Sequence, residues 1–172
     1  MFIKTNQFII RPFKLSDAAD LARNINNAKV ARYTTSIPYP YKLQYAHDWL
    51  AKQIKTYEEK RPENIVWAIE IDREVVGAIG IHKIIYGHKA ELGAWIAQKH
   101  WNKGIMTQVI KIMTDYAFKS FKLKRIYARI FTPNLGSKAV AEKNGFKLEG
   151  IMKKDAKKDG KYYDVYLLSK TK

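Results

Sequence analysis

The hydrophobic pattern of this chain is clearest between residues 90 and 120. An apolar run covers 90–96. After a polar stretch, apolar residues recur at the spacing of one helix face. The members of that stripe are Val109, Ile110, Met113, Tyr116 and Ala117. The pattern therefore predicts a strand, a turn that contains Gly104, and a helix that extends to about Ser120.

Similar patterns predict an alternation of strands and helices along the whole chain. Apolar or alternating runs predict strands at 8–13, 64–71, 75–85, 90–96 and 125–131, with a final hairpin at 146–154 and 162–168. Helical patterns lie at 16–26, 43–60 and 105–120, with a short helix near Ser137. Two prolines exclude regular structure from 36–41. This order predicts an α/β fold, a mixed sheet covered by helices on both faces.

Length and composition indicate a single domain that spans residues 1–172. A chain of this length buries about 70% of its unfolded surface, and 47% hydrophobic residues supply a core. No apolar run reaches the ~18 residues of a membrane span, and the start of the chain lacks the pattern of a secretory signal. There is no cysteine, which excludes disulfides and thiolate chemistry. We therefore expect a cytoplasmic protein with no membrane contact.

The net charge is extreme for this length. The chain has 32 Lys and Arg against 16 Asp and Glu, a formal charge of +16. Lysines are concentrated at 153–161. One interpretation is a well-solvated surface. The other is that the protein works near RNA, as on a ribosome, toward which a positive field would steer it. The same field would attract a phosphorylated ligand.

The turn before the long helix has the chemistry of an anion site. Free backbone N–H groups at a helix start lie beside the positive end of the helix dipole, and this arrangement suits a phosphate. Lys103 adds a full positive charge beside them. A single glycine before a helix is commonplace, so the turn alone is a weak signal.

A second motif at 134–146 strengthens the signal. It follows the strand at 125–131 and is expected to form a short helix. Ser137 can cap the start of this helix, and Gly145 suits the left-handed position just after its end.

Together these two blocks resemble the GNAT family of acetyl-CoA-dependent N-acetyltransferases, and within it the RimJ/RimL branch. Segments at 8–13, 47–50, 145–150 and 159–165 extend the resemblance over nearly the whole chain. The resemblance implies a single GNAT-like domain with a mixed, mostly antiparallel sheet and a splayed central strand pair. It also implies acetyl-CoA as co-substrate.

No metal is expected. The histidines show no metal-ligand spacing among themselves, and no cysteine accompanies them. They are His47, His82, His88 and His100. His82, in an apolar strand, is interpreted as a hydrogen-bonded structural side chain.

The resemblance also implies how the cofactor is held. The pantetheine arm would pair with the edge of the strand at 90–96, and the pyrophosphate would lie on the turn. Asn134 would orient the cofactor. The cofactor-binding residues implied in this way are Trp95, Ile96, Asn102, Lys103, Gly104, Ile105, Met106, Thr107, Asn134, Ser137 and Lys143. Two positions depart from the commoner family pattern: Trp101 replaces an Arg or Gln, and Met106 replaces a Gly or Ala.

The catalytic groups are less clearly specified. Many relatives protonate the leaving thiolate with a Tyr, but Ala141 occupies that position here, and the RimJ/RimL pattern offers Ser137 instead. Glu91 is the candidate base, acting through water, and the alternative is that it is a surface carboxylate on an edge strand. RimL-like proteins carry a further carboxylate where this chain has Ala156, so Asp155 is a weak substitute.

The acceptor is expected to be a primary amine. Roughly a tenth of protein α-amines are neutral at neutral pH, against about one lysine amine in a few thousand. A site with a poor base therefore suits a protein N-terminus of the ribosomal-protein type. Tyr33, Tyr39 and Tyr41, in and beside the Pro-rich loop, either line the acceptor site or simply pack.

Two alternatives remain open. The acceptor is a small-molecule amine (polyamine, amino sugar or antibiotic), or the chain is a catalytically weak RNA-associated binding module. The chain is expected to be a monomer or a homodimer.

Overall fold

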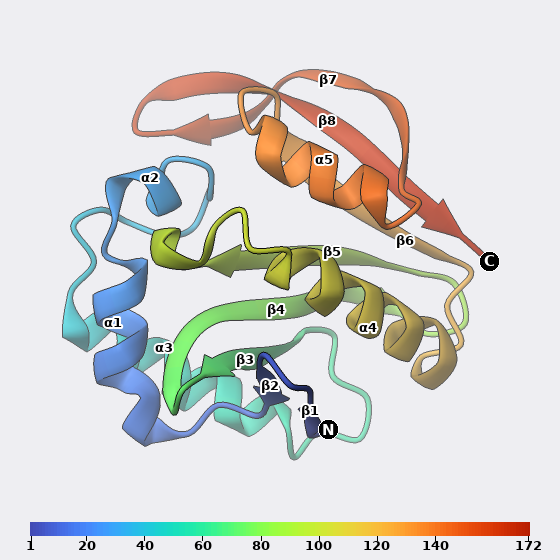
Figure 1. Ribbon diagram of the computed structural model, residues 1–172. Helices are drawn as coiled ribbons and strands as arrows, with labels where there is room; N and C mark the ends of the chain where they lie inside the picture. Colours follow the sequence, from blue (N-terminus) through green and yellow to red (C-terminus); the bar gives the residue numbers. More distant parts are fainter.

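The computed structural model describes all 172 residues, and its central feature is one eight-stranded sheet (Figure 1). The strands adjoin in the order β1-β2-β3-β4-β5-β6-β8-β7. Neighbours are antiparallel except β5 and β6, which run parallel. The strands are β1 (Ile3–Lys4), β2 (Ile9–Arg11), β3 (Ile65–Ile71), β4 (Glu74–Ile85), β5 (Lys89–Ile96), β6 (Arg125–Phe131), β7 (Lys147–Lys158) and β8 (Lys161–Thr171).

Five α-helices accompany the sheet. They are α1 (Ala18–Ile25), α2 (Ala28–Ala31), α3 (Leu43–Thr56), α4 (Ile105–Ser120) and α5 (Leu135–Lys143). In Figure 1, α4 and α5 lie in front of the sheet and α3 lies behind it. No helix is both long enough and apolar enough to cross a membrane.

Each face of the sheet has its own core, because successive side chains of a strand point to opposite faces. On one face, Met113 of α4 packs with Ile79 and Ile81 in a cluster of 25 buried residues. On the other face, Leu21 of α1 and Leu50 of α3 belong to a cluster of 13. The predicted mixed sheet with helices on both faces is confirmed.

The sheet is split at its centre. β5 pairs with β6 only from Lys89 to Glu91, opposite Arg125 to Tyr127. Pairing of β4 with β5 continues to Ile96, and pairing of β6 with β8 continues to Phe131. The two halves of the sheet are therefore continuous within themselves but separate beyond Glu91 (Figure 1). This is the splayed central pair that the family resemblance implies.

The predicted elements are present, with differences at their ends. The helix expected at 43–60 ends at Thr56, where Tyr57 turns inward and its hydroxyl accepts a hydrogen bond from the Phe13 N–H at 3.0 Å. The final hairpin is longer than predicted because its turn lies at Asp159 and Gly160, both with positive φ. β1 and α2 were not predicted, since elements this short carry no periodic signal.

A buried ionic network fixes the N-terminal side of the sheet. Arg11 of β2 donates two hydrogen bonds of 2.8 Å to the carboxylate of Asp17 and a third to Glu70 of β3. Asp17 also accepts the Lys14 N–H at 2.8 Å. The side chains of Arg11 and Asp17 are 9% and 7% exposed, so neither charge has water as a substitute partner.

Replacing Asp17 with Ala is expected to lower the free energy of unfolding by about 3 kcal/mol, because the buried guanidinium of Arg11 loses its bidentate carboxylate partner. Urea denaturation followed by tryptophan fluorescence measures the loss. The control is Glu142→Gln, which removes the partner of Lys138 in an exposed pair and should cost at most about 0.5 kcal/mol. Equal losses in the two variants would contradict an anchoring role for the Arg11 network.

Candidate functional site

The turn between β5 and α4 presents a row of free backbone donors. The N–H groups of Asn102, Lys103 and Gly104 donate to no other residue. Those of the next three residues form the first turn of α4, where no preceding helical carbonyl can accept them. Gly104 has φ 75°, and Asn102 has φ 60°. These left-handed conformations turn the chain into the helix. The predicted anion site, with Lys103 exposed beside it, therefore has the required geometry.

Trp101 ties this turn to the end of β5. Its indole Nε1–H donates to the Ile96 carbonyl at 2.9 Å, and the side chain is 37% exposed. The indole occupies the position where the family usually has Arg or Gln. Here its contact is with the strand edge, so it sets the distance between that edge and the turn.

The open edge of β5 is defined by hydrogen-bond alternation. Ala97 N–H donates to the Val76 carbonyl of β4 at 2.7 Å, so the residues in phase with Ala97, including Trp95, direct their backbone groups toward β4. Leu92, Ala94 and Ile96 direct theirs toward β6, from which this part of β5 has separated. Leu92 flanks the last pair, Glu91 with Tyr127, so the strand edge that can pair with an extended ligand consists of Ala94 and the N–H of Ile96.

This alternation distinguishes the two β5 residues predicted to bind the cofactor. Ile96 offers its free N–H to the gap. The backbone of Trp95 pairs with Ala78, and its side chain packs against the core of the α1 and α3 face. Ala94 was not predicted, although it lies on the open edge. The sequence could not identify Ala94, because the residues that face the open edge can be assigned only when the strands on each side of β5 are known.

The start of α5 differs from the prediction in one respect. Asn134, not Ser137, is the N-cap, and its side-chain oxygen accepts the Ser137 N–H at 3.2 Å. Ser137 was predicted as the cap because its type suits that role, but it lies three residues into the motif, within the first helical turn. Its exposed hydroxyl forms no hydrogen bond within the protein and is available to a ligand.

The end of α5 follows the prediction. Gly145 has φ 81°. The N–H groups of Gly145 and Phe146 donate to the Glu142 and Ala141 carbonyls at 2.9 and 3.1 Å, the usual glycine-terminated helix end. Lys143, in the last turn, is exposed.

The face opposite α4 carries a polar cluster beside the split. Glu91 of β5 accepts a hydrogen bond from Lys83 at 2.7 Å and is 17% exposed. It belongs to a central strand, so its interpretation as an edge-strand carboxylate is wrong. On β6, Tyr127 is paired in register with Glu91, at the last paired position before the split. Burial, and then the Glu91 carboxylate, raise the pKa of the Tyr127 hydroxyl.

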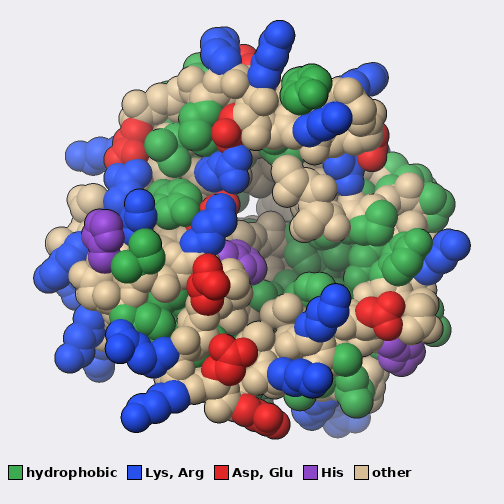
Figure 2. Space-filling view, turned by 180° about the vertical axis from the view of Figure 1, so that it is seen from behind, with side chains coloured by type: hydrophobic (Ala, Val, Ile, Leu, Met, Phe, Trp, Pro, Cys, Tyr) green, Lys and Arg blue, Asp and Glu red, His purple; other side chains and the backbone are tan.

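Asp155 of β7 reaches the same face. It pairs with Arg129 of β6, and this pairing raises the pKa of Arg129 above its usual value. Figure 2 shows the molecule from this side, where a hollow lies near the centre with basic and acidic side chains around it. The carboxylates of Glu91 and Asp155 are therefore each neutralised by a neighbouring cation.

The three predicted acceptor tyrosines are not brought together. Tyr33 packs on a small cluster formed by Phe131, Ala156 and Val165. Tyr41 is buried in the core of the α1 and α3 face. Tyr39 is 55% exposed. Of the three, Tyr33 lies closest to the polar face, since its partners come from β6, β7 and β8.

The Pro-rich loop spans the two halves of the sheet on this face. The buried Lys158, at the end of β7, donates to the Ile37 carbonyl. Together with Tyr33, this bond attaches the segment after α2 to the β7–β8 hairpin. The loop therefore contacts the hairpin on the same face of the sheet as Glu91 and Asp155.

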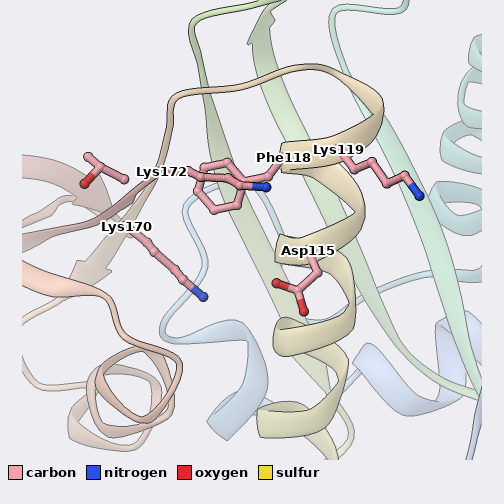
Figure 3. A pocket seen from close by; sticks show the side chains of 6 residues that line it. Asp115, Phe118, Lys119, Lys170 and Lys172 are labelled. Atoms are coloured by element: carbon pink, nitrogen blue, oxygen red, sulfur yellow. The ribbon is translucent and has the colours of Figure 1, made fainter.

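A second, open hollow of about 390 Å³ lies elsewhere (Figure 3). It lies between the C-terminal half of α4, which carries Asp115 and Lys119, and the end of β8, which carries Lys170. This is the opposite end of α4 from the turn. No group of three or more His, Cys, Asp or Glu side chains is arranged to hold a metal ion.

Comparison with known proteins agrees with this geometry. Residues 7–147 match the acetyltransferase (GNAT) domain family. YoaA, an uncharacterized N-acetyltransferase of Bacillus subtilis, is 31% identical over 97% of this chain and 94% of its own length. The spermidine N(1)-acetyltransferase of Escherichia coli is 27% identical over 89% of this chain and 80% of its own. The solved structure of RimL, a ribosomal L7/L12 alpha-N-protein acetyltransferase in complex with coenzyme A, has a TM-score of 0.89 at 20% identity, covering 99% of this chain and 98% of that one.

Replacing Gly104 with Pro is expected to abolish acetyl-CoA binding. Proline removes one N–H and requires φ near about −65°, which is incompatible with the observed 75°. Thermal unfolding with and without acetyl-CoA measures the effect. The wild-type protein should gain about 2.7 kcal/mol at a hundred times the dissociation constant, and the variant should gain nothing.

A milder pair of variants separates binding from backbone strain. Gly104 and Gly160 both have positive φ, and a Cβ on either would meet nothing within 4 Å. Gly104→Ala and Gly160→Ala should therefore lose similar stability, about 1–2 kcal/mol each, while only the first weakens acetyl-CoA binding. Full binding by Gly104→Pro would rule out the turn as the phosphate site.

Proposed function

The chain belongs to the GNAT acetyltransferase family, and on that premise we propose that it transfers the acetyl group of acetyl-CoA to the α-amine at the N-terminus of a protein. The reaction class, acetyl-CoA-dependent N-acetylation, comes with the family. The acceptor is inferred from the charges on the polar face and from the chemistry of amines.

The cofactor fits the split as a strand would. The pyrophosphate occupies the N–H groups from Asn102 to Thr107, and Lys103 and Lys143 add positive charge. The pantetheine arm pairs with the open edge of β5 in place of β6. The free N–H of Ile96 then faces the thioester oxygen and stabilises the negative charge that develops there during attack.

The balance of charge on the polar face carries the choice of acceptor. A polyamine or an aminoglycoside is a polycation, and binding one requires unpaired carboxylates. Glu91 is paired with Lys83, and Asp155 with Arg129. The protein as a whole carries +16. A site whose carboxylates are already paired, on a strongly positive protein, repels a polycation. It accepts a single ammonium on an otherwise uncharged or acidic peptide.

The chemistry of the amine leads to the same acceptor. Deprotonating an α-amine of pKa about 7.7–8.0 at neutral pH costs ~1 kcal/mol, whereas a lysine side chain costs ~4–5 kcal/mol. Glu91 is already paired with Lys83, so it gives the amine little help in losing its proton. An N-terminal amine is the acceptor that this site can serve with the least help.

Two side chains are proposed to act on the reacting atoms or close to them. Ser137 has a free hydroxyl in the first turn of α5 and donates a proton or a hydrogen bond to the leaving thiolate. Glu91 lies beside the split and assists removal of the amine proton through water. Asn134 orients the cofactor with the amide N–H groups that capping leaves free, since the cap uses only its oxygen.

A polyamine remains the second candidate because one relative over most of the chain is a spermidine N(1)-acetyltransferase. It would require the Lys83–Glu91 pair to open so that Glu91 can bind an ammonium. The N-terminal acceptor requires no such rearrangement.

An acceptor panel tests the proposal. Peptides with free N-termini, the same peptides with blocked N-termini, spermidine and an aminoglycoside are incubated with the protein and acetyl-CoA. Because the chain has no cysteine, a thiol reagent reports only released CoA. We expect turnover with free N-terminal peptides to exceed turnover with spermidine at least tenfold. Faster turnover of spermidine would assign the protein to the small-molecule class.

Ser137→Ala is expected to lower kcat at least tenfold while the affinity for acetyl-CoA changes less than twofold. The helix should keep its stability, since its cap is Asn134. Asn134→Ala serves as the contrasting variant and should cost about 1 kcal/mol of stability. An unaltered kcat in Ser137→Ala would remove that residue from the mechanism.

A further inference from the structure

His82 lies on the polar face, in the middle of β4 and directly opposite Glu91 of β5. It is half-buried, and its ring forms no hydrogen bond with any protein group, so its interpretation as a hydrogen-bonded structural histidine is wrong. Its ring nitrogens are not fully buried and retain contact with solvent.

Two glycines make room for this ring. A Cβ on Gly80 would overlap Nε2 of His82 and lie 2.8 Å from its Cε1. A Cβ on Gly93 would lie 3.2 Å from both Nε2 and Cδ2. Gly80 and Gly93 are paired in register on β4 and β5. The imidazole thus lies flat on the sheet, in a slot that exists only because both facing residues lack a side chain.

The slot directs the ring toward the end of the β5–β6 split at which acetyl transfer is proposed to occur. The ring of His82 lies over Gly80, two residues earlier in β4. It therefore points toward the start of β4, where Ala78 pairs with Trp95. The open edge of β5 at Ala94 and Ile96 is at this same end. The Nε2 end of the imidazole therefore projects toward the place where the thioester and the incoming amine must meet.

Burial favours the neutral form of the His82 imidazole, and the charged groups nearby partly offset one another. Burial lowers the pKa of the imidazole. Glu91 on β5 acts in the opposite direction, and Lys83 on β4 lowers the pKa further. Tyr127 and Arg129 on β6 lie beside Glu91, and β3 contributes the apolar Val66. A neutral imidazole beside a carboxylate can accept a proton and have the resulting charge stabilised.

We propose that His82, in place of Glu91 acting through water, is the general base that takes the proton from the acceptor ammonium, with Glu91 stabilising the imidazolium that results. The N–H bond of the ammonium breaks and its proton moves to His82. The amine nitrogen then bonds to the thioester carbon, and the C–S bond breaks. The nitrogen loses a second proton, the CoA thiolate takes one, and His82 returns its own to water. This role requires only acetyl transfer to an amine, whichever amine the acceptor panel identifies.

The pH profile of kcat/KM separates a base from a structural residue. A peptide α-amine has a pKa of about 7.7–8.0. With His82 as base, the wild-type protein remains active below that value, because the bound ammonium can still be deprotonated. In His82→Gln the rate should fall about tenfold for each unit below the pKa of the amine, because only the neutral amine reacts. The fall in kcat/KM at low pH therefore begins at a higher pH in the variant than in the wild-type protein.

The matched control is His88→Gln. His88 is exposed in the turn between β4 and β5, away from the split, and its substitution should leave the profile unchanged. Acetyl-CoA binding is measured in parallel by thermal shift and should be retained in both variants. An acid limb in His82→Gln that coincides with the wild-type limb would overturn the proposal.

The glycine slot provides a second test that leaves His82 in place. Gly80→Ala forces the ring out of its slot and should reduce kcat/KM and shift the profile as His82→Gln does. In a His82→Ala background the same change should have less than a twofold further effect, a strong non-additivity. Additive losses would show that Gly80 acts by some other route and that His82 is not held for catalysis. A wrong acceptor class would instead change which amine is acetylated while leaving both comparisons intact.

Discussion

The early end of hydrogen bonding between β5 and β6 is the constraint on which the rest of the structure depends. Three pairs of residues hold the two halves of the sheet together, and beyond Glu91 no strand pairs with β5 on that side. Unpaired strand edges are costly and invite an extended ligand. The turn after β5 adds free N–H groups at the start of α4. The proposed cofactor site therefore consists mainly of backbone groups.

A site built from backbone explains why departures from the family pattern are tolerated. Trp101 supplies no cation to the phosphates, but its bond to the Ile96 carbonyl holds the turn against the strand edge. Met106 has a side chain where a smaller residue is common, and it is accommodated because the position has helical dihedrals and lies inside α4. The proposed cofactor site uses the left-handed conformation at Gly104 and the hydrogen-bond phase of β5, and neither of these depends on the side chains of Trp101 and Met106.

The opposite face of the split is organised by side chains. Its carboxylates are paired with Lys83 and Arg129, which removes the negative charge that a polycation would need. His82 has no such partner and occupies a slot between two facing glycines. In the proposed function this contrast gives the two faces different tasks: one would hold a phosphorylated donor through N–H groups, and the other would manage the proton of a single amine.

The sequence by itself determined the order of strands and helices, the turn at Gly104, the end of α5 at Gly145 and the family, because periodicity, turn residues and motif spacing are local properties. Only the tertiary structure decided which strands are neighbours. It thereby placed Glu91 on a central strand, and Ala94 and Ile96 on the open edge, while the Trp95 backbone pairs with β4. It also placed Tyr41 in the core. It also showed Asn134 as the cap in place of Ser137, and His82 lying across Gly80 and Gly93. These outcomes depend on register and on the side each neighbour occupies, and contacts between residues distant along the chain set both.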